Sequence, residues 1–265
     1  MSPKNIFNIF GLRFHSLSMQ QTLEQVEKFI RNYSVPKMIF TPTAELIVRA
    51  NEDEILRNIY NSSDLLTVDS YVVYYAARLL GHNIPEPVSA ARLMLNLLPI
   101  IHKKGYSIYL LGATEEIVNK VVENLKKQYP NINIVGWHNG YFDLENDIEI
   151  VDDIRKNKPD ILFVAMSSPL KERFISKNLN KMNVPVSIGV GGTFDIIARK
   201  CNLAPKWVSK IGLEWFYRLC QEPKRLYKRY LITNTKFLYI FIKEFFLERI
   251  LKWKSIKNFM EEKKF

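Results

Sequence analysis

The feature that most constrains the fold is a regular alternation of short apolar runs with segments of helical spacing. Runs such as Met38–Phe40, Tyr106–Leu111 and Ile161–Ala165 are apolar throughout, and each precedes a segment whose apolar residues recur three and four positions apart. Strands of this kind are typical of a parallel sheet that helices cover on both faces. The sequence therefore predicts an α/β fold with a Rossmann-like, mainly parallel sheet.

The same periodicity sets the expected bounds of the elements. Strands are expected over 38–40, 65–68, 106–111, 133–135, 161–165 and 184–188. Helices are expected over 18–31, 44–60, 71–80, 93–103, from Thr114 onward, 148–155 and 170–182.

Polar or glycine-containing clusters follow each of the expected strands. Ligands of parallel α/β sheets bind beyond the carboxyl ends of the strands, so clusters at that edge predict a single cleft. The clusters are Thr41–Glu45, Asp69, Gly112, Gly140–Phe142, Ser167–Glu172 and Gly189–Asp195.

The segment Gly189–Asp195 contains the densest group of glycines. It follows the apolar run Val184–Ile188 and precedes a helical pattern, which predicts a strand–turn–helix junction. Backbone without side chains can approach an anion closely at such a junction. A tight structural turn explains the glycines equally well when they are considered alone.

Beyond about Lys206 the alternation stops and the chain becomes basic and aromatic. Residues 206–265 hold fifteen Lys/Arg and six Asp/Glu, a net +9 of the chain's +11. We therefore expect an α/β core over 1–205 and a helical, basic C-terminal appendage over 206–265. Such an appendage implies an anionic partner: nucleic acid, phosphates or an acidic membrane. Aromatic and aliphatic residues at helical spacing, such as Phe237, Ile240 and Phe241, favour a membrane-facing or core-packing helix over nucleic-acid binding.

The remaining composition points to a cytoplasmic protein. Cys201 and Cys220 have no partner at metal-ligand spacing, and they are expected to be reduced, packing cysteines. No signal peptide is recognisable at the N-terminus. The longest apolar stretch, 237–242, is too short to cross a bilayer, which needs about 20 apolar residues.

Residues 212–229 read Gly-Leu-Glu-Trp-Phe-Tyr-Arg-Leu-Cys-Gln-Glu-Pro-Lys-Arg-Leu-Tyr-Lys-Arg. This stretch closely resembles the C-terminal signature of the WecG/TagA/CpsF glycosyltransferases, glycosyltransferase family 26, and the resemblance extends from about Gly11 to Arg229. It implies a hexosyltransferase that moves a sugar from a UDP-sugar to an undecaprenyl-diphosphate-linked saccharide in surface polysaccharide synthesis. The implied location is the inner face of the cell membrane, with peripheral attachment through the appendage.

The resemblance also assigns roles to residues. Asp69 matches the aspartate of the family's Asp-Gly motif, which implies that it is the catalytic base; by itself, an aspartate at this place is more often a helix N-cap. The strand-end clusters and the matched motifs together give the expected substrate-binding set. Its members are Thr41, Thr43, Arg92, Gly112, Gly140, Tyr141, Phe142, Ser168, Lys171, Glu172, Gly191, Gly192, Asp195, Arg218, Arg225 and Arg229.

No metal and no cofactor are expected. The sequence has no Asp-x-Asp pair, so the leaving diphosphate is expected to be held by backbone amides near Gly191 and by the arginines at 218, 225 and 229. Such a site would carry out an inverting, metal-independent transfer. The alternative is a diverged, non-catalytic member of the family that retains affinity for a nucleotide or a lipid diphosphate.

Several positions depart from the family pattern. The departures are Thr43, Ser70, Pro87, Ala90, Arg92, Lys171 and Arg199. Arg92 and Lys171 add cations where the family has an acidic residue and a glutamine. This difference leads us to expect a donor sugar other than N-acetylmannosamine, with an acidic sugar preferred.

Overall fold

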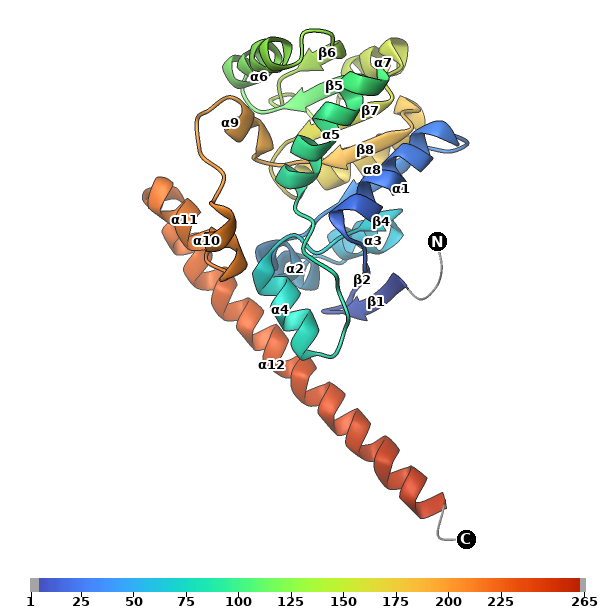
Figure 1. Ribbon diagram of the computed structural model, residues 1–265, viewed down its shortest axis with the longest axis vertical. Coiled ribbons are helices and arrows are strands. Elements are labelled where there is room, and N and C mark those ends of the chain that lie inside the picture. Colours follow the sequence, from blue (N-terminus) through green and yellow to red (C-terminus); the bar gives the residue numbers. More distant parts are fainter. Residues whose placement is uncertain (1–4, 263–265) are drawn as a thin grey trace.

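The computed structural model describes residues 5–262, together with all side chains in this range except those of Arg225 and residues 248–262. Within it, six strands form one parallel sheet in the order β4-β3-β8-β7-β5-β6, and a separate antiparallel hairpin joins β1 to β2 (Figure 1). The predicted α/β class is confirmed. The strands are β1 (Ile6–Ile9), β2 (Leu12–His15), β3 (Lys37–Phe40), β4 (Leu65–Leu66), β5 (Ser107–Gly112), β6 (Asn133–His138), β7 (Ile161–Ala165) and β8 (Val186–Gly189).

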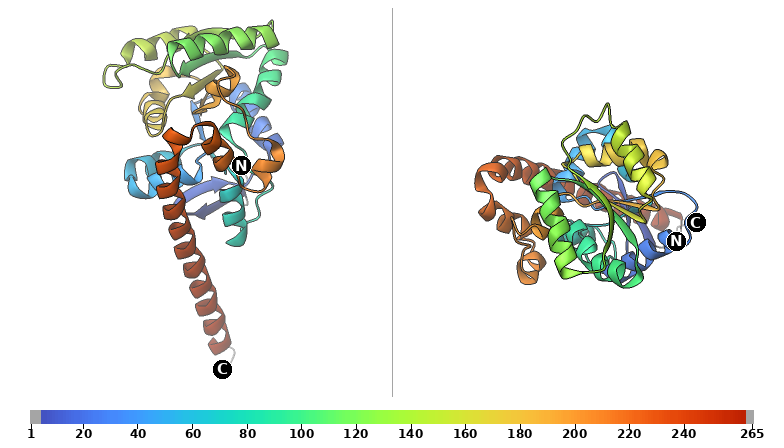
Figure 2. Two further views of the ribbon diagram at one scale, coloured as in Figure 1. Left: turned by 90° about the vertical axis from the view of Figure 1, so that its left-hand side faces the viewer. Right: turned by 90° about the horizontal axis from the view of Figure 1, so that it is seen from above.

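Helices cover both faces of the sheet (Figure 2). They are α1 (Met19–Arg31), α2 (Ala44–Glu52), α3 (Glu54–Ser62), α4 (Tyr71–Leu79), α5 (Ala90–Lys104), α6 (Glu115–Gln128), α7 (Ile148–Asn157), α8 (Leu170–Met182), α9 (Thr193–Ile197), α10 (Lys206–Lys210), α11 (Glu214–Gln221) and α12 (Pro223–Glu262).

The core has two halves, one on each side of the sheet, because successive strand residues point to opposite faces. In β7, Leu162 and Val164 pack with α2, α3, α7 and α8, whereas Ile161 and Phe163 pack with α1, α5 and α6. All four side chains are fully buried. Burial on both faces explains why the strands are apolar at every position rather than at alternate ones.

The helix expected over 44–60 is two helices. Asp53 leaves the helical conformation, with φ −121° and ψ 103°, and its carboxylate accepts a hydrogen bond from the Leu56 amide at 3.0 Å. It therefore ends α2 and caps α3. Similarly, α5 begins at Ala90 rather than at Leu93, because the Ser89 hydroxyl accepts from the Arg92 amide at 3.3 Å.

The hairpin β1–β2 was not expected. Its turn places Phe10 and Gly11 at positive φ, and Phe10 and Phe14 are buried. The hairpin gives the C-terminal helix a surface to pack against, because the rings of Phe10 and Phe237 meet edge to face at 5.3 Å.

The first half of α12 is part of the folded body, and the helix then continues beyond it (Figure 1). α12 packs against α2, and its Phe237 is only 6% exposed. Further along, Glu244 accepts a hydrogen bond from the Phe10 amide at 3.3 Å. Phe237 is therefore a core residue, which favours the core-packing alternative for this part of the helix.

Among the described residues, no helix is long and apolar enough to cross a membrane. Cys201 and Cys220 are both free, and Cys201 is half-buried. Cys220 is exposed rather than packed, because it lies on the outer face of α11.

Candidate active site

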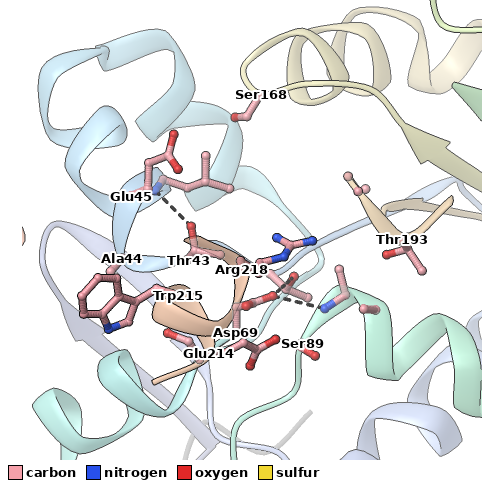
Figure 3. Close-up of a pocket in the computed structure, with 18 of the residues that line it drawn as sticks. Thr43, Ala44, Glu45, Asp69, Ser89, Ser168, Thr193, Glu214, Trp215 and Arg218 are labelled. Carbon is pink, nitrogen blue, oxygen red and sulfur yellow. Dashed lines mark hydrogen bonds between the residues drawn. The ribbon is translucent and has the colours of Figure 1, made fainter. Parts of the chain in front are cut away.

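A cleft of about 930 Å³ opens at the carboxyl edge of the sheet. Residues that follow β3, β4, β7 and β8 line it on one side, and residues from α10, α11 and α12 line it on the other. The predicted convergence of strand-end clusters at one edge is therefore realised, and the C-terminal segment closes the cleft. Figure 3 shows Asp69, Glu214 and Arg218 together within it.

Asp69 is held by two hydrogen bonds to one oxygen. The Thr41 hydroxyl donates to Oδ2 at 3.0 Å, and the Ala90 amide donates to the same atom at 3.2 Å. The other oxygen, Oδ1, is thus the one available to accept a proton from a ligand. Asp69 does not cap α4: that helix begins after Ser70, which makes no side-chain capping bond.

The pKa of Asp69 is raised to about 7, first by burial and then by the nearby Glu214 carboxylate. The hydrogen bonds from Ala90 and Thr41, and the Arg218 guanidinium, act in the opposite direction. A carboxyl group with a pKa near neutrality is poised to exchange a proton at physiological pH.

Glu214 and Arg218 reach the cleft from α11, where they lie four residues apart on the same side of the helix. The Glu214 role was missed, although its helix partner Arg218 was expected in the site. The four-residue spacing to Arg218 was the signal that could have identified it.

The glycine turn after β8 lies directly beneath Arg218. Gly191 adopts a positive φ of 49°, and a Cβ built on Gly192 would come 3.2 Å from Nη2 of Arg218. A side chain at position 192 would therefore displace the guanidinium. The turn and the arginine together offer backbone and a cation at one point of the cleft wall.

Arg229 also lines the cleft, but it is already paired. Its Nε lies 3.3 Å from Glu45, whose carboxylate also accepts from Arg49 at 2.8 Å. Arg49 in turn donates to the Ser168 carbonyl at 3.0 Å. This network fastens α12 to α2 and to the loop after β7. The side chain of Arg225 lies outside the described residues.

The cleft wall after β7 contains a buried ion pair. Lys171 Nζ lies 2.6 Å from Glu172 Oε1, which also accepts from the Tyr60 hydroxyl at 2.8 Å. Burial and the Glu172 charge raise the pKa of Tyr60. Glu172 Oε2 is buried without a hydrogen-bond partner among the described atoms.

The other expected site residues fall into two groups: some line the cleft, and others lie outside its lining. Thr43, Asp195 and the 77%-exposed Tyr141 line the cleft, and the Thr43 hydroxyl also caps α2. Gly112, Gly140 and Phe142 lie outside the lining. A Cβ on Gly112 would collide with the Ala165 backbone, and one on Gly140 would lie 3.0 Å from Gly112 Cα. Phe142 packs on Phe174 at 5.6 Å.

Arg92 and Lys171, the two cations that depart from the family pattern, do not face the cleft as free charges. Lys171 is neutralised by Glu172, and Arg92 donates to the Ala204 carbonyl at 3.4 Å and to the Ser209 hydroxyl at 3.3 Å. Arg92 thereby ties α5 to α10. Neither arrangement supports the expectation of an acidic donor sugar.

The described residues contain no group of three or more His, Cys, Asp or Glu side chains placed to hold a metal ion.

A parallel α/β sheet with a carboxylate and an arginine in a cleft at its carboxyl edge is an arrangement suited to group transfer from a phosphorylated donor. Comparison with known proteins gives the family: the model for the glycosyl transferase WecG/TagA/CpsF family matches residues 7–250. The chain belongs to this family, as its resemblance implied, and is a glycosyltransferase. The family match gives no support to the alternative that the chain is a diverged, non-catalytic binding protein.

Two relatives carry the same name, N-acetylglucosaminyldiphosphoundecaprenol N-acetyl-beta-D-mannosaminyltransferase. The one from Bacillus subtilis (strain 168) is 28% identical over 236 residues, which cover 89% of this chain and 91% of the relative. The one from Staphylococcus aureus (strain MW2) is 31% identical over 220 residues, which cover 83% of this chain and 86% of the relative.

Proposed function

We propose that this enzyme transfers N-acetyl-β-D-mannosamine from a UDP-sugar to N-acetylglucosaminyl-diphosphoundecaprenol, in the synthesis of a surface polysaccharide. The names of the two relatives support the sugar and the acceptor. The observation that carries the chemistry is Asp69, fixed through Oδ2 and with a pKa of about 7, in the same cleft as Arg218 and the glycine turn.

In the proposed reaction, Asp69 Oδ1 accepts the proton of the acceptor hydroxyl as that oxygen attacks the anomeric carbon of the donor sugar. The bond between that carbon and the diphosphate breaks, and UDP leaves with the bonding electron pair. A single displacement of this kind places the new bond opposite the old one, so the reaction inverts the anomeric configuration. Thr41 keeps the carboxylate oriented during the transfer.

The charge that develops on the leaving diphosphate is met by Arg218 and by the backbone of the Gly191–Gly192 turn. Their proximity supports this role, since Arg218 lies directly against Gly192. Arg229 acts indirectly, because its ion pair with Glu45 holds α12 over the cleft. We therefore propose that the transfer needs no metal ion.

We further propose that the enzyme works at the inner face of the cell membrane, where its lipid-linked acceptor resides. The basic composition of residues 206–265 supports attachment to anionic headgroups. On α12, Tyr239 and Phe246 are exposed and would enter the interfacial region of a bilayer.

The proposal is tested with purified enzyme, N-acetylglucosaminyl-diphosphoundecaprenol in detergent, and a panel of UDP-sugars. We expect UDP-N-acetylmannosamine to be the best donor, with activity retained in excess EDTA. A preference for a UDP-uronic acid would contradict the proposed donor. Loss of activity in EDTA that manganese or magnesium restores would contradict the proposed metal independence.

A further inference from the structure

The cleft continues beyond its polar centre into an apolar channel between α4 and α12. On α4, four of the lining residues (Val72, Tyr75, Ala76 and Leu79) lie at positions i, i+3, i+4 and i+7 and so share one face of the helix, and Tyr71 adds to the lining at the start of the helix. On α12, the lining residues also follow one face. The apolar members of these two stripes, together with Ile211, define the α4–α12 channel: Val72, Tyr75, Ala76, Leu79, Ile211, Phe237, Leu238 and Phe241.

The two stripes line one cavity but leave large apolar surfaces uncovered. Leu79 is 66% exposed, Leu238 is 55% exposed and Ile211 is 59% exposed. Among the described residues, α12 makes its principal helix contacts with α2 and α11 rather than with α4. The channel is therefore an open apolar space between helices that do not pack closely on each other, and exposed apolar surface of this kind is typical of binding sites.

Contacts at its borders fix the walls of the channel. The Tyr75 hydroxyl donates to the Lys210 carbonyl at 2.6 Å, which joins α4 to α10. A Cβ built on Gly212 would lie 3.5 Å from Val72, so the turn between α10 and α11 rests on α4. On the opposite wall, Phe237 is anchored on Phe10. The channel is thus held open by the fold.

We propose that the α4–α12 channel binds the isoprenoid chain of the acceptor, in the part next to the diphosphate. This inference rests on the proposed function for the identity of the acceptor. Its physical support is continuity: the channel and the polar centre with Asp69 and Arg218 belong to one cleft. In the proposed reaction Arg218 holds the diphosphate of the donor, and the acceptor hydroxyl lies at Asp69, so the acceptor's own diphosphate and the attached hydrocarbon are within reach of the channel. A branched hydrocarbon has no hydrogen-bonding groups, so apolar walls are the surface that it binds.

The proposal is tested by direct binding, which needs no turnover. The probes are inorganic diphosphate and farnesyl diphosphate, a short isoprenoid chain on the same anion, in buffer without detergent or lipid. The channel variants are Leu79→Gln and Leu238→Gln. Both side chains are more than half exposed, so the fold should tolerate the changes. The control variant is Leu231→Gln, whose side chain is also exposed on α12 but lies outside the cleft lining.

We expect the wild type to bind farnesyl diphosphate about tenfold or more tightly than inorganic diphosphate, because the channel buries apolar surface. Each channel variant should lose most of this gain while its affinity for inorganic diphosphate stays unchanged, and Leu231→Gln should keep the gain. Equal binding of the two probes by the wild type would overturn the proposal. So would channel variants that keep the gain, or a control that loses it equally, since the last result indicates a general lipid-facing surface.

Failure of the proposed function gives a different pattern. If the wild type transfers no sugar to the undecaprenyl-linked acceptor, the assigned acceptor is wrong, whatever the binding results. If transfer occurs but the channel variants bind farnesyl diphosphate as the wild type does, only the channel assignment is wrong.

Discussion

At the scale of single residues, the central feature is a carboxylate whose protonation is set by its neighbours. Thr41 from the end of β3 and Ala90 from α5 donate to Asp69, while Glu214 and Arg218 from α11 place opposite charges near it. The effects of burial and of the Glu214 charge outweigh those of the hydrogen bonds and of Arg218, so the pKa of Asp69 is raised to about 7. A base with this pKa is about half ionised at neutral pH, and its ionised form accepts a proton readily.

This arrangement predicts the pH dependence of the reaction. The ionised form of Asp69 is the active one, so kcat/KM should rise with pH through about 7. Glu214→Gln removes the neighbouring negative charge, which lowers the pKa of Asp69 and shifts this rise to lower pH. The measurement is kcat/KM from pH 5 to 9 for both proteins. A rise at the same pH in the variant would show that Glu214 does not tune the base.

At the scale of elements, the C-terminal helix is held in place by core packing as much as by ion pairs. Phe237 packs on Phe10, Lys236 Nζ lies 2.5 Å from Glu52, and Arg229 pairs with Glu45. Because the ion pairs are partly exposed, we expect Phe237 to contribute the most to the docking of α12.

Phe237→Ala should therefore destabilise the protein by about 3–5 kcal/mol, the range for removal of a buried phenylalanine side chain. The matched control is Tyr239→Ala, two residues further along α12 and 68% exposed, which should change stability by less than about 0.5 kcal/mol. Urea unfolding measures both. Similar losses for the two variants would contradict the anchoring of α12 through Phe237.

Much of the sheet and of its helices could be predicted because burial leaves a direct imprint on the sequence. The bounds of β7 and α8 agree with those expected, since β7 is an uninterrupted apolar run and the apolar residues of α8 recur at helical spacing. The break at Asp53 was missed although the apolar stripe changes phase there: on one continuous helix, the buried residues of α2 and those of α3 would lie on opposite sides. The hairpin β1–β2 was missed because the exposed polar residues Asn8 and Arg13 interrupt its strands, which therefore do not form continuous apolar runs.

The candidate site was predictable where polar residues follow strands, and less so where the chain folds back. Asp69 and the glycine turn follow strands that the pattern identifies. Gly112 also follows a strand and was therefore expected in the site. Its lack of a side chain instead allows the Ala165 backbone to approach closely. The four-residue spacing of Glu214 to Arg218 could have placed it in the site, but its proximity to Asp69 depends on how α11 docks, and the sequence pattern does not contain that geometry.

At the scale of the whole molecule, the two proposed functions divide between two regions: catalysis is assigned to the cleft, and membrane attachment to the basic end of the C-terminal helix. The cleft lining extends along α12 only to Phe241, whereas residues 248–265 carry further basic residues. The two functions should therefore be separable by truncation.

Truncation after Leu247 keeps Phe237 and Glu244, so the protein should remain folded and transfer sugar to a detergent-solubilised acceptor at nearly the full rate. Its binding to anionic vesicles should weaken, since each basic residue near the surface contributes about 1 kcal/mol. Co-sedimentation with vesicles at low and high salt measures this. Unchanged co-sedimentation would indicate that residues 248–265 do not attach the enzyme to the membrane.

The role of Asp69 as the base that activates the acceptor is the central claim, and Asp69→Asn tests it most directly. The amide has a similar size but cannot accept the proton, so UDP binding and thermal stability should stay close to wild type. With UDP-N-acetylmannosamine and the lipid-linked acceptor, kcat should fall by about a hundredfold or more. Transfer by the asparagine variant at the wild-type rate would contradict the account.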